Sequence, residues 1–452
     1  MTKKSGASFL IVFLAVLAVY ASPTPEQKSQ VFPELSRTPL LNDLQVYIAS
    51  TPYLGDNMTI GLVLRYGSTF DPANKGGVAH LTSQMLGKAT IDMTTKDIQD
   101  ELNYLNATIE VRCDWDGIRL FMRGHSASME RCLLLLYRIT CEAKFNEEDF
   151  SRIQSSLIQQ MQAPEDLRQR VRSQLDMELF RGTTYGRPLR GTPATLKNTV
   201  VGDIRFFHKR YFSPDQAALA VVGSASAQEV LQKSRRIWGV WVRNDEIPFT
   251  FLPAHEPGAR NIFLEDDPSS PAAQYILGNL WPNREDPLYY AGILATRLLQ
   301  ERLTQALPTS RLTVAAEGRR LLGPFYIQGQ AAADQAVDEI NKIINAVDAF
   351  KDAEVKSPEL TKAQDQWIAE FSKALGSTDG ICNALLDAEL YRLGLNYLST
   401  FSDFVRRSNP VMVKDAAKRW LFPGGMVLIM RGPAATLRPQ LESLGTVQLL
   451  KR

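Results

Sequence analysis

Residues 176–181 read Asp-Met-Glu-Leu-Phe-Arg, and residues 387–392 repeat this pattern as Asp-Ala-Glu-Leu-Tyr-Arg. A second match follows each copy in the same order, because Lys-Arg-Tyr-Phe-Ser-Pro at residues 209–214 returns as Lys-Arg-Trp-Leu-Phe-Pro at residues 418–423. The two offsets, 211 and 209 residues, nearly agree. Self-similarity at a fixed period indicates one structural unit used more than once. The sequence therefore predicts two homologous halves.

The boundaries of these halves follow from the Pro-rich stretch between them. Residues 246–258 contain three prolines and a terminal glycine, a composition typical of a linker. The halves are then residues 32–245 and 259–452. The second copy of each repeated segment lies in the second half, as the duplication requires.

Strand-like and helix-like runs alternate within the halves. Residues 58–66 and 109–122 are typical of strands and end at glycine turn signals. Residues 150–161 and 337–350 carry apolar side chains three and four residues apart, which is typical of helices. We therefore expect an α+β fold, in which each half is a mostly antiparallel sheet with helices on one side.

Composition excludes several classes of function. The 452 residues contain 51 Lys+Arg and 49 Asp+Glu, giving a net charge of +2, and 44% of them are hydrophobic. The chain is long and apolar enough for packed domains. Because the charge is balanced and forms no long basic run, no nucleic-acid partner is expected.

The N-terminus has the features of a secretory signal peptide. Lys3 and Lys4 precede an apolar run over residues 9–20, and Ala21 is followed by a polar, Pro-rich stretch. We expect cleavage after Ala21, so that residues 1–21 are removed and the protein is periplasmic or secreted. An uncleaved membrane anchor is the alternative, although the apolar run is shorter than the roughly 20 residues that a spanning helix needs.

Cysteines and standard motifs contribute little chemistry. Four cysteines are too few for a disulfide framework, so we expect mostly buried free thiols at Cys113, Cys132, Cys141 and Cys382. P-loop, Gly-x-Ser-x-Gly and Gly-x-Gly-x-x-Gly signatures are absent from the sequence. Of the four histidines, His125, His208 and His255 are expected to be surface or packing residues. Residues 114–116 (Asp-Trp-Asp) are expected at an exposed strand end.

Two segments carry a resemblance to a known family. Residues 65–68 (Arg-Tyr-Gly-Ser) end a strand-like run, and residues 76–80 (Gly-Gly-Val-Ala-His) open a helix-like one. Residues 185–192 (Tyr-Gly-Arg-Pro-Leu-Arg-Gly-Thr) are similar to a second signature region of the same family. With its duplicated halves, the chain resembles the inverted-motif zinc peptidases: pitrilysin, insulin-degrading enzyme, mitochondrial processing peptidase and the cytochrome bc1 core subunits. The resemblance covers nearly the whole chain after residue 21 and implies that the two halves face each other as a clam-like pair.

The zinc motif of that family is degenerate here. Residues 80–84 read His-Leu-Thr-Ser-Gln in place of H-x-x-E-H, so His80 is retained, Ser83 replaces the Glu, and Gln84 replaces the second His. The family's third ligand, a Glu, falls at Gln160, which is 76 residues after Gln84. The spacing is kept and the charged groups are lost.

This substitution pattern predicts the loss of both metal and base. Catalytic zinc sites use about three imidazole, thiolate or carboxylate ligands plus a water, and His80 is the only retained ligand position. Ser83 cannot act as the general base on a zinc-bound water. We expect no catalytic residue and no bound zinc in this chain, with His80 serving only as a helix-start residue. Gln84 and Gln160 are expected to bond to one another or to His80.

The resemblance also implies a partner. In related heterodimeric peptidases the zinc lies in one subunit, while the other half offers an Arg and, seven residues later, a Tyr that position substrate. The matching positions here fall on Leu303 and Ser310, and Arg302 is one residue out of register. The pair is therefore absent or displaced.

Three functions remain open at this point. The first is a non-catalytic subunit that forms a heterodimer with an active, zinc-holding peptidase homologue and encloses or presents peptide substrates. The second is a structural, core-type scaffold subunit of a larger assembly. The third is a peptidase whose site is not recognised from the sequence.

Overall fold

The computed structural model describes residues 33–163, 166–245, 247, 249 and 251–450. The expected signal peptide, residues 1–21, lies outside these residues, as do positions 246, 248 and 250 of the expected linker. In the described part of the chain, no helix is long and apolar enough to cross a membrane.

The first half contributes a six-stranded sheet in which only β2 and β6 are parallel neighbours. In spatial order its strands are β1 (Glu34–Pro39), β2 (Gln45–Ser50), β6 (Ala217–Gly223), β3 (Asn57–Leu64), β5 (Ile118–His125) and β4 (Thr108–Cys113).

The second half repeats this sheet with a different edge strand, because β12 pairs parallel to β7 where β1 pairs antiparallel to β2. Its strands are, in order, β12 (Thr446–Leu450), β7 (Asn261–Asp266), β11 (Val427–Gly432), β8 (Ala272–Trp281), β10 (Gly323–Ala332) and β9 (Thr313–Ala316). Four of five pairings in the first sheet and three of five in the second are antiparallel. The expected α+β fold with two homologous, mostly antiparallel halves that face each other is confirmed.

Helices cover both sheets. Those of the first half are α1 (Val78–Met85), α2 (Thr95–Tyr104), α3 (Met129–Cys141), α4 (Glu147–Gln162), α5 (Leu167–Leu179), α6 (Pro193–Lys197), α7 (Val201–Tyr211) and α8 (Ala227–Trp238). Those of the second half are α9 (Tyr289–Ala306), α10 (Ala336–Asp352), α11 (Ser357–Ala374), α12 (Thr378–Leu390), α13 (Tyr397–Arg407), α14 (Pro410–Trp420) and α15 (Ala434–Leu441).

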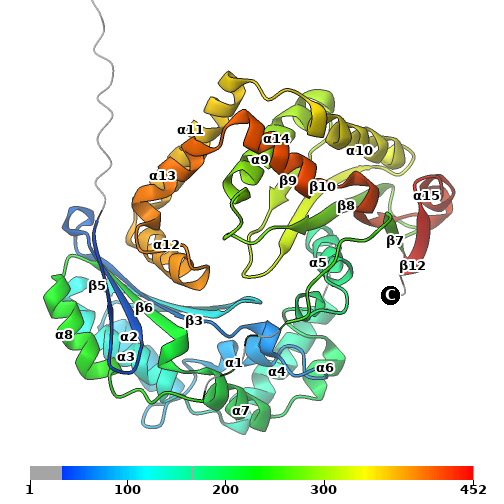
Figure 1. Cartoon of the computed structure of the whole chain (residues 1–452). Helices are drawn as coiled ribbons and strands as arrows, with labels where there is room; N and C mark the ends of the chain where they lie inside the picture. The colour runs from blue at the N-terminus through cyan, green and yellow to red at the C-terminus, as the bar shows by residue number, and fades with distance from the viewer. Residues whose placement is uncertain (1–32, 164–165, 246, 248, 250, 451–452) are drawn as a thin grey trace, which may run out of the picture. The chain divides into compact units, whose positions relative to one another are not determined.

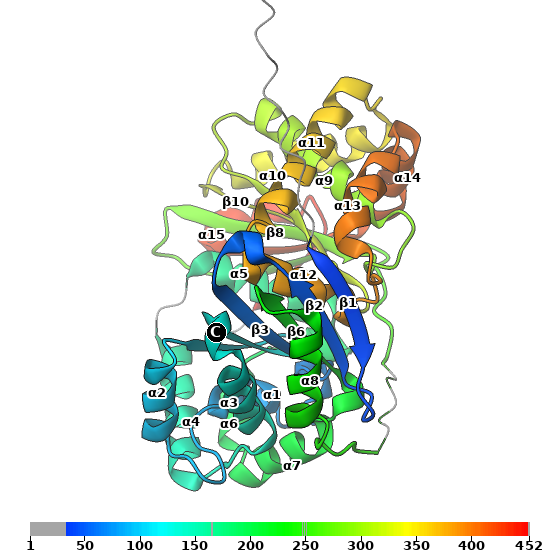
Figure 2. The same cartoon turned by 90° about the vertical axis from the view of Figure 1, so that its left-hand side faces the viewer.

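One helix of each half packs on the sheet of the other half. Helix α12 lies against β3 and β6 of the first sheet, and α5 lies against β8 and β11 of the second (Figure 1). Helices α3 and α8 cover the opposite face of the first sheet (Figure 2). The sequence predicts helices on one side only. This expectation is wrong, because both faces of each sheet are covered. The second face is covered by a helix of the other half: α12 on the first sheet and α5 on the second.

The alternation of side chains along the strands explains why both faces need cover. In β2, Val46 and Ile48 point into the core under the first half's own helices, while Tyr47 and Ala49 join the core formed with α12. In β8, Ile276 packs with α5 and Leu277 packs on the other face. Successive side chains of a strand point to opposite faces. A sheet that is apolar on both faces therefore needs a helix layer on each.

The repeated segment provides the anchors of the two exchanged helices. Asp387 at the end of α12 forms an ion pair with Arg119 of the first sheet at 2.9 Å. Its counterpart Asp176 at the end of α5 pairs with Arg319 of the second half at 3.2 Å. The equivalent aspartate of each repeat copy thus holds its helix on the opposite half.

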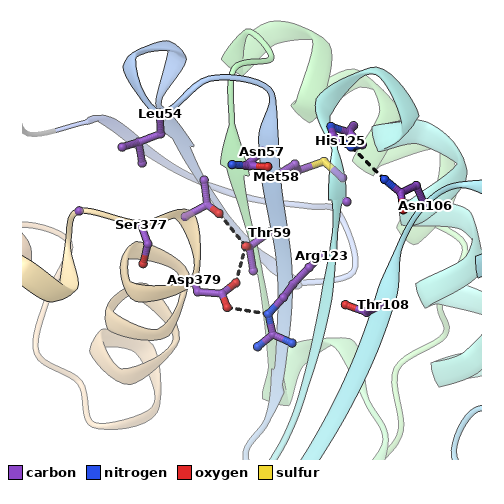
Figure 3. Close-up of a pocket in the computed structure, with 13 residues that line it drawn as sticks. Leu54, Asn57, Met58, Thr59, Asn106, Thr108, Arg123, His125, Ser377 and Asp379 are labelled. Atoms are coloured by element: carbon purple, nitrogen blue, oxygen red, sulfur yellow. Dashed lines mark hydrogen bonds and ion pairs between the residues drawn. The ribbon is translucent and has the colours of Figure 1, made fainter.

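The start of α12 is anchored as well. Asp379 accepts a hydrogen bond from the Thr59 hydroxyl at 2.6 Å and pairs with Arg123 Nε at 2.6 Å (Figure 3). Near the other end of the helix, the buried Glu389 accepts a bond from the Tyr47 hydroxyl at 2.6 Å and pairs with Arg65. Polar contacts therefore fix α12 along most of its length.

Two strand glycines let the exchanged helices approach the sheets. A Cβ atom on Gly61 of β3 would overlap the Cys382 sulfur and lie 2.8 Å from Leu386 Cδ1, both on α12. A Cβ atom on Gly278 of β8 would lie 2.7 Å from Leu175 Cδ2 on α5. Glycine in a strand often marks such a close approach.

Some local expectations need correction. Residues 109–122 are not one strand but the hairpin β4 and β5, which turns at residues 114–117.

The helices expected at residues 150–161 and 337–350 are confirmed as α4 and α10. The described residues of the expected linker pack on both halves, since Phe249 stacks on Tyr66 and Glu256 accepts a bond from the Leu280 amide at 2.7 Å.

The close approach of α12 to β3 generates a prediction. Gly61→Ala should lower the free energy of unfolding by about 1–3 kcal/mol, because the added methyl overpacks a core that cannot expand freely. Chemical denaturation measures this difference. Gly258→Ala is the matched control, since nothing lies within 4 Å of the Cβ position there. Equal stability of the two variants would contradict the close contact between α12 and β3.

Candidate functional site

Helix α1 carries the start of the degenerate motif and is held by a buried carboxylate. Asp71 accepts hydrogen bonds from the Gly77 and Ala79 amides, each at 2.7 Å. These amides belong to the first turn of α1, whose N–H groups have no partner within the helix. Burial raises the pKa of Asp71 to about 7, while the two amide donors act in the opposite direction. Asp71 thereby fixes the helix that presents His80.

The two signature segments meet at this helix start. Gly77 has a φ of 97°, a left-handed conformation that favours glycine, and a Cβ there would lie 2.6 Å from the Arg190 carbonyl oxygen. Thr195 donates its hydroxyl to the Gly76 carbonyl at 2.8 Å. The loop that contains Arg190 is therefore packed directly onto the glycines before α1.

His80 lies half-buried on α1, with its Nδ1 atom buried and without a hydrogen-bond partner in the described part of the protein. Burial and, to a smaller extent, the positive charge of Arg190 together lower the pKa of His80 to about 4. The imidazole is therefore neutral at physiological pH, as a metal ligand would need to be.

The other two motif positions on α1 behave as ordinary helix residues. Ser83 is 1% exposed and donates its hydroxyl to the His80 carbonyl at 2.7 Å, a bond within the helix. Gln84 is half-buried. Ser83 therefore has no group that titrates near neutral pH, and its proton is committed to the His80 carbonyl.

Gln160 does not join them. It lies on α4, which packs against α1, but its side chain is exposed and its Nε2 donates to Ser156 Oγ at 3.3 Å. No hydrogen bond among the described residues links Gln160, Gln84 and His80. The expectation that these amides bond to one another or to His80 is wrong, because the exposed side chain of Gln160 turns to Ser156 on its own helix.

These side chains do not fit a zinc ion. Zinc prefers imidazole, thiolate and carboxylate donors, and His80 supplies the single donor of that kind at the motif positions. The described residues contain no group of three His, Cys, Asp or Glu that could hold a metal. The Arg190 charge that depresses the pKa of His80 would also repel a divalent cation.

Other candidate residues have structural partners. Leu303 is buried, Ser310 donates to Glu339 at 2.7 Å, and Arg302 pairs with Glu359 at 2.8 Å. None of the three is free to position substrate as the family's Arg and Tyr do.

The remaining histidines and cysteines play packing or surface roles. His125 and His255 are exposed, and His208 packs between Phe145 and Phe212. All four cysteines are free thiols; Cys132 and Cys382 are buried, and Cys113 and Cys141 are half-buried. The expectation of free thiols is confirmed.

The Asp-Trp-Asp segment is not an exposed strand end. It forms the turn between β4 and β5, and Asp116 is 4% exposed. Asp116 accepts bonds from the Tyr185 hydroxyl and from the Arg320 amide of the second half. The sequence could not reveal this, because these partners lie 69 and 204 residues away.

The environment of His80 generates a prediction. Histidine titration followed by NMR should place the midpoint of His80 near pH 4, with a small upward shift in Arg190→Gln, since burial is the main cause. Because the folded-state pKa lies below the unfolded value, His80 contributes stability that is complete above about pH 6.5 and declines as the pH falls toward 4. A midpoint near 6.5 would contradict the buried environment.

Two family descriptions match consecutive segments of the chain. Residues 47–193 match the family described as Insulinase (Peptidase family M16), and residues 200–367 match the one described as Peptidase M16 inactive domain. The chain is 21% identical over 411 residues to the zinc protease PqqE of Helicobacter pylori, covering 85% of this chain and 89% of that protein. It is 23% identical over 277 residues to a probable mitochondrial-processing peptidase subunit beta of Arabidopsis thaliana, covering 59% and 51%.

Solved structures share the fold. A peptidase M16 inactive domain from Pseudomonas fluorescens superposes with a TM-score of 0.81 at 20% identity, over 88% of this chain and 98% of that one. A protease from Helicobacter pylori gives a TM-score of 0.79 at 17% identity, over 89% and 100%. The chain spans about half the length of the first curated relatives it matches. Together with the two matched segments, these findings show that the chain belongs to peptidase family M16, the insulinase family.

Proposed function

We propose that this chain is a non-catalytic member of the family that pairs with an active zinc-peptidase homologue and helps to enclose its peptide substrate. The observation that carries the proposal is the side-chain set at the motif: His80 remains, while Ser83, Gln84 and Gln160 replace the base and two ligands. Zinc would then be held by the partner.

The surroundings of the motif support a lasting loss of the metal. Arg190 places a positive charge near His80, and Ser83 is buried within its own helix. A single imidazole ligand and a nearby cation disfavour zinc at this position. Asp71 caps α1 through two backbone amides, a contact that involves none of the motif side chains.

The relatives support a role in an assembly. Several are named as subunits of the mitochondrial processing peptidase, and one is named as a subunit of the cytochrome b-c1 complex. The N-terminal segment supports a periplasmic or secreted location after cleavage near Ala21. In such a compartment the partner is an M16 homologue with an intact H-x-x-E-H motif.

The partner can be tested by purification from the native cells. A tagged chain should bring down an intact H-x-x-E-H homologue in about equal amount, and the pair should cleave peptides in a chelator-sensitive manner while the isolated chain does not. Recovery with a larger assembly that lacks peptidase activity would favour the scaffold function instead. Chelator-resistant cleavage by the isolated chain would contradict the proposal and indicate an unrecognised site.

The degenerate motif can be tested by restoring its ligands. Gln84→His with Gln160→Glu should give measurable zinc uptake in equilibrium dialysis, because ligand-type side chains would then stand at all three motif positions and the exposed residue 160 side chain is free to turn toward α1. Adding Arg190→Gln should strengthen uptake by removing a repelling charge. Each single variant is the control and should take up little zinc. A folded triple variant without zinc uptake would show that Gln84 and Gln160 do not occupy ligand positions.

A further inference from the structure

Helix α7 presents an exposed face that is basic and apolar. Its buried side chains, Val201, Ile204 and Phe207, point to the core of the first half. The exposed residues follow at spacings of three and four, so they share the opposite side of the helix and form what we call the basic face: Gly202, Arg205, Phe206, Lys209 and, beside them, Arg210. Helix α7 packs against α1 and lies at the lower edge of the first half in the view of Figure 2. It carries none of the zinc-motif positions.

The single acidic residue of α7 adds no free negative charge to the basic face. Both carboxylate oxygens of Asp203 lie 2.6 Å from Lys75 Nζ, and Oδ2 also accepts a bond from the Val200 amide at 2.9 Å. Asp203 is therefore neutralised by a cation of the loop before α1 and caps the start of its own helix. The charge of the basic face comes from its cations alone.

These cations are not paired with acidic side chains. In the described part of the chain, Lys209 and Arg210 form no ion pair, and neither does Lys197 on the preceding α6. Arg205 donates to the Phe145 carbonyl at 2.7 Å, and this neutral partner leaves its charge uncompensated. Unpaired cations on one surface attract anions over about a Debye length, roughly 8 Å at physiological salt.

The acidic residues around the basic face are fewer than its cations. Glu147 and Glu148 are exposed at the start of α4, close to Phe145, and the exposed Lys144 precedes them. Asp245 is exposed beyond the C-terminal end of α7. Lys144 and the four cations on and before α7 outnumber these three acids. Because the whole chain has a net charge of only +2, this excess of positive charge is a local feature.

Apolar side chains stand among these cations. Phe206 is 59% exposed, and Val200, just before the helix, is 55% exposed. Phe206 follows Arg205 directly and lies about one turn from Arg210 on the same helix. Lysine and arginine together with exposed large apolar side chains are the groups with which peripheral helices contact a bilayer.

The loop after α8 extends the apolar part of this surface. Asn244 Nδ2 donates to the Lys209 carbonyl at 2.9 Å, which joins the loop to the C-terminal end of α7. Asn42 Nδ2, in the turn between β1 and β2, donates to the Trp241 carbonyl of the same loop at 2.8 Å. Three exposed aliphatic side chains are thereby held beyond the end of α7: Leu41, Val240 and Val242.

We propose that the basic face, with the adjoining loop, docks on the surface of a lipid bilayer that contains anionic headgroups. The cations would lie at the level of the headgroup phosphates, and Phe206 and Val200 would reach the boundary of the acyl chains. A bilayer fits this surface better than an acidic protein does. A convex helix face offers no groove for a partner's side chains, whereas a bilayer admits apolar side chains at any point of its surface.

Sedimentation of residues 22–452 with lipid vesicles tests the proposal. Residues 1–21 are left out because their apolar run would itself partition into vesicles of any composition. The protein should sediment with vesicles of phosphatidylcholine and phosphatidylglycerol and stay in solution with vesicles of phosphatidylcholine alone. Binding should weaken at least about tenfold when the salt concentration is raised from about 0.05 M to about 0.5 M, because salt screens the attraction.

A pair of charge variants tests the cations. Lys209→Gln with Arg210→Gln should weaken vesicle binding at least about tenfold, because each cation near an anionic surface contributes to the attraction. Lys342→Gln with Lys373→Gln is the matched control, since both are exposed lysines of the second half, on α10 and α11. This control should bind as the unchanged chain does.

A second variant tests the apolar contact without changing the charge. Phe206→Ser should weaken vesicle binding at least about threefold, because a large apolar side chain no longer enters the bilayer. Tyr104→Ser is the matched control, since Tyr104 is an exposed aromatic residue on α2, outside the basic face. Thermal unfolding of each variant shows that it is folded.

Two kinds of result would overturn the proposal. The first is equal binding to both kinds of vesicle, or unchanged binding by the folded double variant at Lys209 and Arg210. The second is binding to polyglutamate that is as tight as binding to the vesicles and unaffected by Phe206→Ser, since this would identify an acidic polypeptide as the occupant. Neither result changes the outcome of the test by purification of the peptidase partner.

Discussion

The exchange of α5 and α12 between the halves is the contact on which the rest of this structure depends. Each sheet is apolar on both faces, and its own half covers only one of them. The second face is buried by a helix of the other half, anchored through Asp176 or Asp387 of the duplicated segment. Each half therefore completes the core of the other.

The contacts that hold the degenerate motif in place lie outside the motif positions. Helix α1 is held by Asp71 and by the loop around Arg190, and neither contact involves a zinc ligand. His80 can therefore remain neutral and unpartnered on an ordered helix.

The sequence predicts the duplication and the degenerate motif because both are local patterns. Residues 176–181 and 387–392 must fit equivalent positions, so their likeness survives in the sequence. The exchange itself is not predicted, since the apolar face of a helix does not reveal which sheet it covers. The burial of Asp116, the charge of Arg190 near His80 and the exposure of Gln160 depend on partners distant in sequence. The sequence predicts one strand over residues 109–122 and not the turn at residues 114–117, because the two flanking strands share one alternation of apolar and polar side chains.

Thermal unfolding by calorimetry, in a chelator and again with added zinc, tests the central claim most directly: two halves that fold as one unit without metal. The account predicts a single cooperative transition whose midpoint is the same in both solutions, because a ligand raises the midpoint only by binding the folded state. Two separate transitions would contradict the mutual completion of the cores. If zinc raised the unfolding midpoint equally in the wild type and in His80→Ala, a metal would bind elsewhere in the chain. If His80→Ala abolished that rise, the result would contradict the loss of the zinc site.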